Sequence, residues 1–284
     1  NAAALQPPVL LLPAALSVWG LEGITRIILQ NVTDPSQTAI YAVGTRVAAV
    51  IAVILFGFQM SWQVHSCKLM KESELPVRPF ISAANWLWYL GGSAVAILGI
   101  FGPELIFVLA GDSYSESRHV VYWIGFSMLL WTFFYIASTG YQYAMKSKHN
   151  IHAVVSGLLV VIVASPFAAK YFGATGVAIM SFLGYWVAVV IAARKANRYE
   201  KIDFRWKRIG YWQAFLIIVC VTSGLYSLEG ASSLPELIFV GSLKILGSMG
   251  VMFIGYRLLL DNCDRDVLVG RLNMLRGILN ARGR

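Results

Sequence analysis

The stretch Leu11–Gln30, LLPAALSVWGLEGITRIILQ, decides the class of this protein. It is apolar over about 20 residues, the length that a helix needs to cross the hydrocarbon core of a bilayer. Glu22 and Arg26 interrupt it four positions apart, so on a helix they share one face. A charge near the centre of a span costs about 2.5–3.5 kcal/mol on insertion scales. The stretch therefore predicts a transmembrane helix that lines a functional cavity, or a local Glu22–Arg26 ion pair that reaches the nearer membrane surface.

Composition extends this interpretation to the whole chain. Of the 284 residues, 58% are hydrophobic and only 13% are charged, whereas soluble domains carry about 25% charged residues. We therefore expect an integral membrane protein. The net charge of +9 does not indicate nucleic acid as a partner, because the basic residues lie between apolar segments rather than on one folded surface. The start at Asn1, without a charged leader, is typical of a piece of a longer protein.

Apolar segments of membrane length recur along the chain and predict an all-α fold, because helices satisfy their own backbone hydrogen bonds in lipid. We expect eight spans in a helical lobe over residues 1–260, followed by a basic amphipathic tail over 261–284. The spans lie near residues 9–30, 38–61, 80–101, 119–144, 151–169, 172–193, 210–228 and 236–259. Between the fifth and sixth, Gly173-Ala-Thr-Gly176 leaves almost no loop, and Phe101–Tyr114 predicts a short interfacial helix.

Basic residues alternate along the connections in a way that predicts the orientation. One set of connections and the tail hold 18 of the 23 Lys and Arg residues, whereas the other set holds only Arg118 and Lys170. Cytoplasmic loops are the basic ones in membrane proteins. We therefore expect both ends of this chain on the cytoplasmic side, with membrane lipids around the spans.

Motifs for catalysis are absent from the sequence. It contains no GxSxG elbow, P-loop, HExxH or paired-cysteine motif. His149 and His152 lie three residues apart without a neighbouring acid or cysteine that would complete a metal site. We expect no enzyme activity, no cofactor and no metal.

Four charged residues within the expected spans remain as candidates for substrate binding: Glu22, Arg26, Arg46 and Lys244. At 1.5 Å per residue, Arg26 lies roughly 7 Å below the outer membrane surface, and Arg46 and Lys244 lie roughly 12 Å below it. Three cations against one acid predict a cavity that attracts a phosphate-bearing substrate. In the alternative, Glu22 neutralises Arg26, while Arg46 and Lys244 extend to the surface. Gln59, Asn85 and Gln142 are weaker candidates.

Several short motifs, taken in order, resemble the C-terminal lobe of Wzx-type oligosaccharide flippases in the multidrug/oligosaccharidyl-lipid/polysaccharide exporter superfamily. Pro13 followed by Arg26-Ile-Ile-Leu29 resembles the helix that opens that lobe, and Tyr41-Ala-Val-Gly-Thr-Arg46 is similar to the start of the next helix. The further resemblance lies in Glu104–Tyr114, in Gly140 with Lys146-Ser-Lys148, and in Gly173-Ala-Thr-Gly176-Val-Ala178. Thr25 stands where the family usually has Asp, which leaves an ion-coupling role open.

The resemblance implies the second lobe of a two-lobed exporter in the bacterial inner membrane, with the N-terminal lobe missing from this chain. The implied activity is transport of polyprenyl-pyrophosphate-linked oligosaccharide from the inner to the outer leaflet for surface polysaccharide biosynthesis. Arg26 corresponds to a cavity-lining arginine, and a polymerase and glycosyltransferases are the implied partners. Alternatives are a multidrug exporter, a flippase for the peptidoglycan precursor, and a membrane scaffold that does not transport.

Overall fold

The computed structural model describes residues 23–69, 77–144, 148–223 and 234–260, with backbone alone over 234–239. In these ranges every regular element is helical and none is a strand, which confirms the all-helical class. Residues 23–32 are helical and precede a turn at 33–34. The later elements are α2 (Pro35–Leu69), α3 (Val77–Trp86), η1 (Leu87–Gly91), α4 (Gly92–Ile100), α5 (Gly102–Ala110), η2 (Asp112–Tyr114), α6 (Ser117–Ala137), α7 (Thr139–Tyr143), α8 (Lys148–Ala196), α9 (Trp206–Ser223) and α10 (Leu234–Leu259).

Five stretches of the described chain are long and apolar enough to cross a membrane. They are Pro35–Leu69, Val77–Ile100, Ser117–Ala137, Lys148–Ala196 and Val240–Leu259. The expected number of eight is not confirmed. Two expected spans fall within α8, α9 is not among the five stretches, and most of 9–30 lies outside the described residues. The class of membrane protein is supported, and the count is open.

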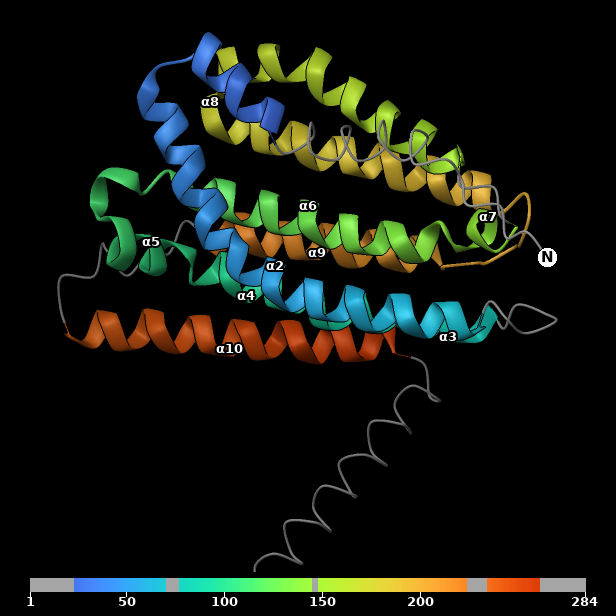
Figure 1. Ribbon diagram of the computed structural model, residues 1–284. Helices are drawn as coiled ribbons and strands as arrows, with labels where there is room; N and C mark the ends of the chain where they lie inside the picture. The colour runs from blue at the N-terminus through green and yellow to red at the C-terminus, as the bar shows by residue number, and fades with distance from the viewer. Residues whose placement is uncertain (1–22, 70–76, 145–147, 224–233, 261–284) are drawn as a thin grey trace, which may run out of the picture.

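The longest element, α8, is a hairpin of two helical legs joined at Gly173 (Figure 1). Gly173 has φ 55° and ψ −139°, a backbone conformation that side chains with a Cβ rarely adopt. Small residues let the two legs approach, because a methyl group on Gly157 would lie only 2.5 Å from the carbonyl oxygen of Gly184. The tight connection expected at Gly173–Gly176 is therefore confirmed.

A hydrogen bond from α2 fixes the turn of this hairpin. The Gln37 side-chain oxygen accepts the backbone N–H of Ala174 at 2.9 Å. That N–H belongs to the first turn of the second leg, where helix donors lack intrahelical partners. Gln37 therefore acts as a helix cap supplied from 137 residues away.

The central helix of the described fold is α6, most of whose residues are buried. It contacts α8, α2 and α4. Against α2, the backbone at Gly44 lies so close that a Cβ there would be 2.6 Å from Val120. Near the same crossing, the Ser117 hydroxyl donates to the carbonyl of Ile40 at 2.9 Å. This hydrogen bond and the close packing join α2 and α6 firmly.

A π-helical turn, η1, lies within the 24-residue path Val77–Ile100. There the Trp212 indole N–H of α9 donates to the carbonyl of Trp88 at 2.9 Å. Trp212 in turn packs against Gly255 of α10, where an added Cβ would lie 2.7 Å from the indole ring. The π-helical turn is therefore one of the places where α9 and α10 contact the rest of the fold.

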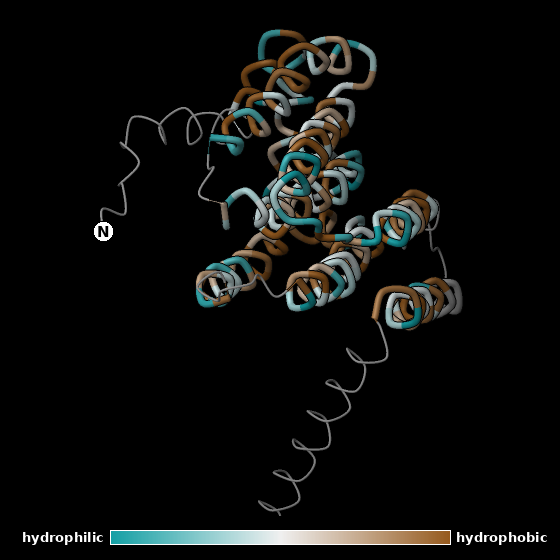
Figure 2. Tube along the Cα trace, turned by 90° about the vertical axis from the view of Figure 1, so that its right-hand side faces the viewer, coloured by the Kyte–Doolittle hydropathy of each residue, from teal (hydrophilic) through white to brown (hydrophobic). Residues whose placement is uncertain are grey.

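The helices run between two ends that differ in their side chains. Figure 2 shows the helices nearly end-on, with hydrophobic residues along their lengths and hydrophilic residues gathered at the near end. Contacts place His149 and Tyr199 together at this end and Gln37 and Ala174 together at the other. The short helix expected within Phe101–Tyr114 is confirmed as α5, and its position in the membrane interface stays a prediction.

Candidate functional site

Arg26 and Arg46 lie on two neighbouring helices that a buried contact holds together. The Tyr41 hydroxyl of α2 donates to Thr25 Oγ1 at 3.2 Å, and Thr25 is fully buried. Its neighbour Arg26 is exposed, as is Arg46, five residues beyond Tyr41. Within the described residues, no carboxylate lies within ion-pair distance of either guanidinium group. Two cations are therefore presented at the surface of apolar helices without a protein counter-charge in that part of the chain.

The depth of Arg46 follows from its position along α2. It lies 11 residues after Pro35, the first residue of the helix, or about 16 Å along the helix axis. The hydrocarbon core of a bilayer is about 30 Å thick. If α2 begins near one membrane surface, Arg46 lies near the middle of the core.

Glu22, the fourth candidate, lies outside the described residues. Its expected pairing with Arg26 therefore stays a prediction.

Lys244 differs from the two arginines because the structure gives it a carboxylate. Its Nζ forms an ion pair and a hydrogen bond with Oε1 of Glu104 in the first turn of α5. The Lys244 side chain is only 4% exposed and that of Glu104 is 21% exposed. Lys244 therefore contributes little net positive charge to a cavity, and its predicted substrate contact remains a prediction.

The sequence analysis did not identify this ion pair. Glu104 and Lys244 are 140 residues apart, and no periodicity relates them. A weak signal existed, since Glu104 follows Gly102-Pro103 at an interrupted apolar segment and Lys244 stands alone in an apolar helix. Beside Lys244 lies a cavity of about 200 Å³ with Ile100, Val219 and Ser223 among its lining residues.

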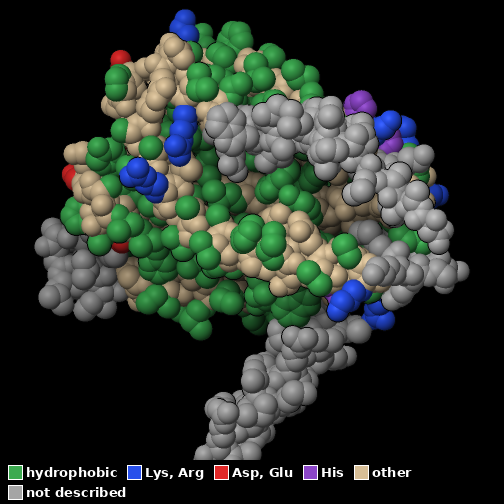
Figure 3. Space-filling model, in the orientation of Figure 1, with side chains coloured by type: hydrophobic (Ala, Val, Ile, Leu, Met, Phe, Trp, Pro, Cys, Tyr) green, Lys and Arg blue, Asp and Glu red, His purple; other side chains and the backbone are tan. Residues whose placement is uncertain are grey.

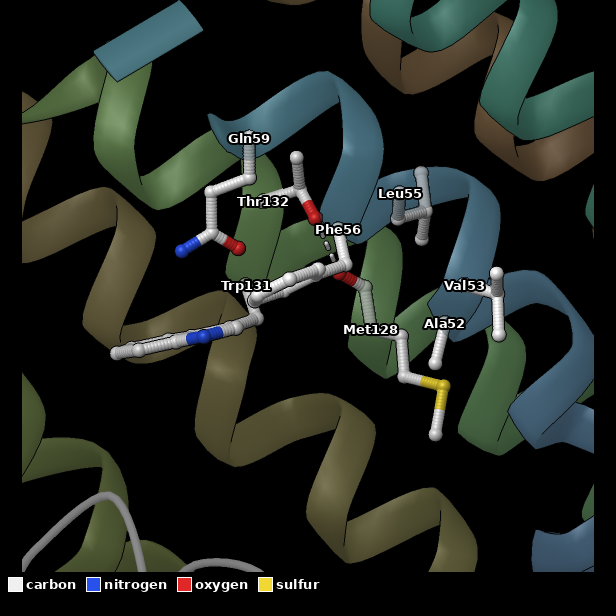
Figure 4. Close-up of a pocket in the computed structure, with 8 residues that line it drawn as sticks. All are labelled: Ala52, Val53, Leu55, Phe56, Gln59, Met128, Trp131 and Thr132. Atoms are coloured by element: carbon white, nitrogen blue, oxygen red, sulfur yellow. Dashed lines mark hydrogen bonds between the residues drawn. The ribbon is translucent and has the colours of Figure 1, made fainter. Parts of the chain in front are cut away.

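A larger groove, of about 460 Å³, opens between α2 and α6 (Figure 4). We call it the α2–α6 groove, lined by Ala52, Val53, Leu55, Phe56, Gln59, Met128, Trp131 and Thr132. Its walls are mainly apolar. In Figure 4 the amide of Gln59 points toward the indole of Trp131. Gln59, a weaker candidate from the sequence, thus lies in a groove with a large aromatic side chain.

The surface around these residues is mainly hydrophobic. Figure 3 shows hydrophobic side chains spread across the described part of the visible face, a few basic side chains over the first part of α2, and basic side chains at the end where α3 begins. Exposed apolar residues of α2 include Val50, Val53 and Phe56, at 58%, 74% and 58% exposure. Such a surface suits contact with lipid or with another helical unit.

Metal-binding chemistry is not assembled in the described part of the chain, where no group of three or more His, Cys, Asp or Glu side chains lies together. His149 instead shares a 2.9 Å hydrogen bond with the Tyr199 hydroxyl. Cys220 is buried and Cys67 is exposed.

Comparisons with known proteins do not assign the chain to a family. Scans against protein-family models, curated proteins and solved structures find no match.

Proposed function

We propose that this chain is the second lobe of a membrane flippase for polyprenyl-pyrophosphate-linked oligosaccharides. Arg26 and Arg46 would bind the pyrophosphate group as the lipid crosses the inner membrane. The observation that carries the proposal is the exposure of both guanidinium groups on apolar helices, without an ion-pair partner among the described residues. A buried or membrane-facing cation without a partner is costly, and an anionic substrate would compensate it.

Arginine suits this role better than lysine. Its planar guanidinium group presents paired N–H donors that match two phosphate oxygens at once. The buried lysine of this fold is already neutralised by Glu104, so that carboxylate is not available to hold a cationic drug. These two features favour an anionic substrate over the cationic substrates of a multidrug exporter.

The test replaces Arg26 and Arg46 singly with Ala in the full-length protein, in cells that depend on it for surface polysaccharide. A hydrogen bond to a charged group contributes about 1.5–3 kcal/mol, so we expect each variant to reduce substrate affinity roughly 10- to 100-fold. Surface polysaccharide, measured on gels, should fall while membrane expression stays normal. Arg→Lys variants should retain part of the activity.

Lys170→Ala is the matched control, because Lys170 is an exposed cation in the first leg of α8 and has no assigned role. It should leave the polysaccharide level unchanged. Normal polysaccharide in both arginine variants would refute the assignment, and loss of drug efflux instead of polysaccharide would favour a multidrug exporter. A scaffold without transport would be insensitive to both arginines and sensitive to changes in its cytoplasmic loops.

A further inference from the structure

We propose that the α2–α6 groove is a carbohydrate-binding site in which a sugar ring stacks on Trp131 and hydrogen-bonds to Gln59. The inference rests on the proposed function, because it assigns the glycan part of the same substrate to a place in this lobe. Sugar rings have an apolar C–H face and an edge of hydroxyl groups. A site for them therefore needs an aromatic surface with a few polar groups beside it, within walls that exclude water.

Trp131 is held as a firm platform. Its ring centroid lies 5.2 Å from that of Phe134 with an interplanar angle of 12°, and Tyr135 and Tyr185 pack against it at 5.3 and 5.9 Å. These contacts restrict the indole on the protein side, while the residue remains half-buried and lines the groove. A platform that is already ordered loses little conformational entropy when a ligand stacks on it.

Hydrogen-bonding groups are available in the groove. The indole N–H groups of Trp186 and Trp212 donate to protein acceptors, whereas no described residue accepts the indole N–H of Trp131. The Gln59 amide hydrogen-bonds to the Tyr135 hydroxyl, and its two donors and one acceptor leave further capacity for a ligand. Thr132 donates its hydroxyl to the carbonyl of Met128, so it offers only an acceptor. A lipid chain cannot form hydrogen bonds with these groups, whereas sugar hydroxyls can.

The position of the groove relative to Arg46 fits a substrate with an anionic end and a glycan. Arg46 and Val53 are seven residues apart and therefore lie on one side of α2, and Val53 lines the groove. Along the helix axis the groove-lining residues Ala52 to Gln59 lie about 9–20 Å beyond Arg46. This separation exceeds one sugar ring, so an oligosaccharide can occupy the groove while its phosphate contacts Arg46.

The test uses a glycan array probed with the purified full-length protein in amphipol, a solubilising polymer that itself carries no sugar. The array displays free oligosaccharides without lipid or phosphate. The native chain should bind a subset of them. Gln59→Leu and Trp131→Phe should each reduce binding at least 5-fold, because they remove the amide and the indole N–H while retaining apolar volume. Phe167→Leu, at an exposed position of α8 outside the groove, is the matched control and should leave binding unchanged.

The outcomes separate this inference from the proposed function. Arg46→Ala should retain binding of free glycans and lose only polysaccharide export. If the native chain binds no glycan, or if Gln59→Leu and Trp131→Phe bind as well as the native chain, the carbohydrate site is refuted while the role of the arginines still stands. If glycans bind through Trp131 but the arginine variants export normally, the carbohydrate site stands and the pyrophosphate assignment fails.

Discussion

Among single side chains, Lys244 and Glu104 have the clearest energetic consequence. Removing one partner of a buried ion pair leaves an uncompensated charge, which costs about 3–5 kcal/mol. Lys244 is 4% exposed and Glu104 is 21% exposed, so the lysine suffers more from losing its partner. We expect Glu104→Leu to destabilise the fold by about 3–5 kcal/mol, and Lys244→Met to destabilise it less.

The double variant Glu104→Leu/Lys244→Met is the control for this prediction. It removes both charges together, and apolar replacements of a buried pair are often neutral or stabilising. The unfolding midpoint of the detergent-solubilised protein should therefore be highest for the native protein and the double variant, lower for Lys244→Met, and lowest for Glu104→Leu. A double variant that is less stable than either single variant would show that the pair acts through something besides charge compensation.

Arg26 and Arg46 illustrate what a residue pattern can and cannot indicate. Their positions within apolar helices followed from the sequence, because hydropathy and the helical rise are local properties. Their exposure did not follow, since the direction in which a side chain points depends on which helices pack around it. Lys244 shows the reverse, because its isolation in sequence concealed a buried partner in space.

The α8 hairpin depends on close backbone contact between its legs. We expect Gly157→Leu to force these legs apart, because the added side chain would collide with the carbonyl of Gly184. Overpacking of this kind costs about 1–3 kcal/mol. The thermal midpoint of the purified protein, followed by size-exclusion chromatography after heating, measures the loss.

Gly57 of α2 is the matched position for this substitution. It lies in a helix interior like Gly157, and a Cβ there meets no atom within 4 Å. Gly57→Leu should leave the midpoint unchanged or raise it, since Gly costs about 1 kcal/mol in a helix. An equal fall in the thermal midpoint of both variants would show that the added side chain is tolerated equally well in the hairpin and on an open helix face.

Helix positions and helix contacts differ in how well the sequence predicts them. The expected span 38–61 lies within α2, and the expected span 80–101 nearly coincides with the path Val77–Ile100. These spans were predictable because the length of an apolar segment can be read directly from the sequence. The span 236–259 contains several glycines, yet among the described ones only Gly255 packs closely against another helix, and Gly241, Gly247 and Gly250 face open space. Small residues permit an approach without determining which helix makes it.

The charge asymmetry of the entire chain predicts its orientation, which Cys67 can test. Cys67 is exposed near the end of α2, at the basic end expected to be cytoplasmic, whereas Cys220 is buried. In a Cys263→Ser background, a membrane-impermeant maleimide should label inside-out vesicles and not intact cells. Labelling in intact cells would reverse the predicted orientation. The Cys67→Ser variant is the control and should remain unlabelled in both preparations.

For the whole molecule, the sequence predicted the helical class and the membrane character well. It predicted poorly which helices contact one another. The cap from Gln37 to Ala174 and the indole contact from Trp212 to Trp88 span 137 and 124 residues. Neither has a local motif, and the groove between α2 and α6 is lined by residues that lie far apart in the sequence. The charged candidate residues could be identified from the sequence, because a charge within an apolar span is costly in lipid. The groove could be identified only from the arrangement of the helices.

The hydrogen bond between Gln37 and Ala174 has a mechanical consequence for any transport cycle. Gln37 lies nine residues before Arg46 on α2, and Ser117 ties the same part of α2 to α6. Tilting the first turns of α2 alone would break both hydrogen bonds. The first turns of α2, the turn of α8 and the start of α6 would therefore move as one rigid body, with its hinge elsewhere. Arg46 would then shift by rotation of this block rather than by bending of its own helix.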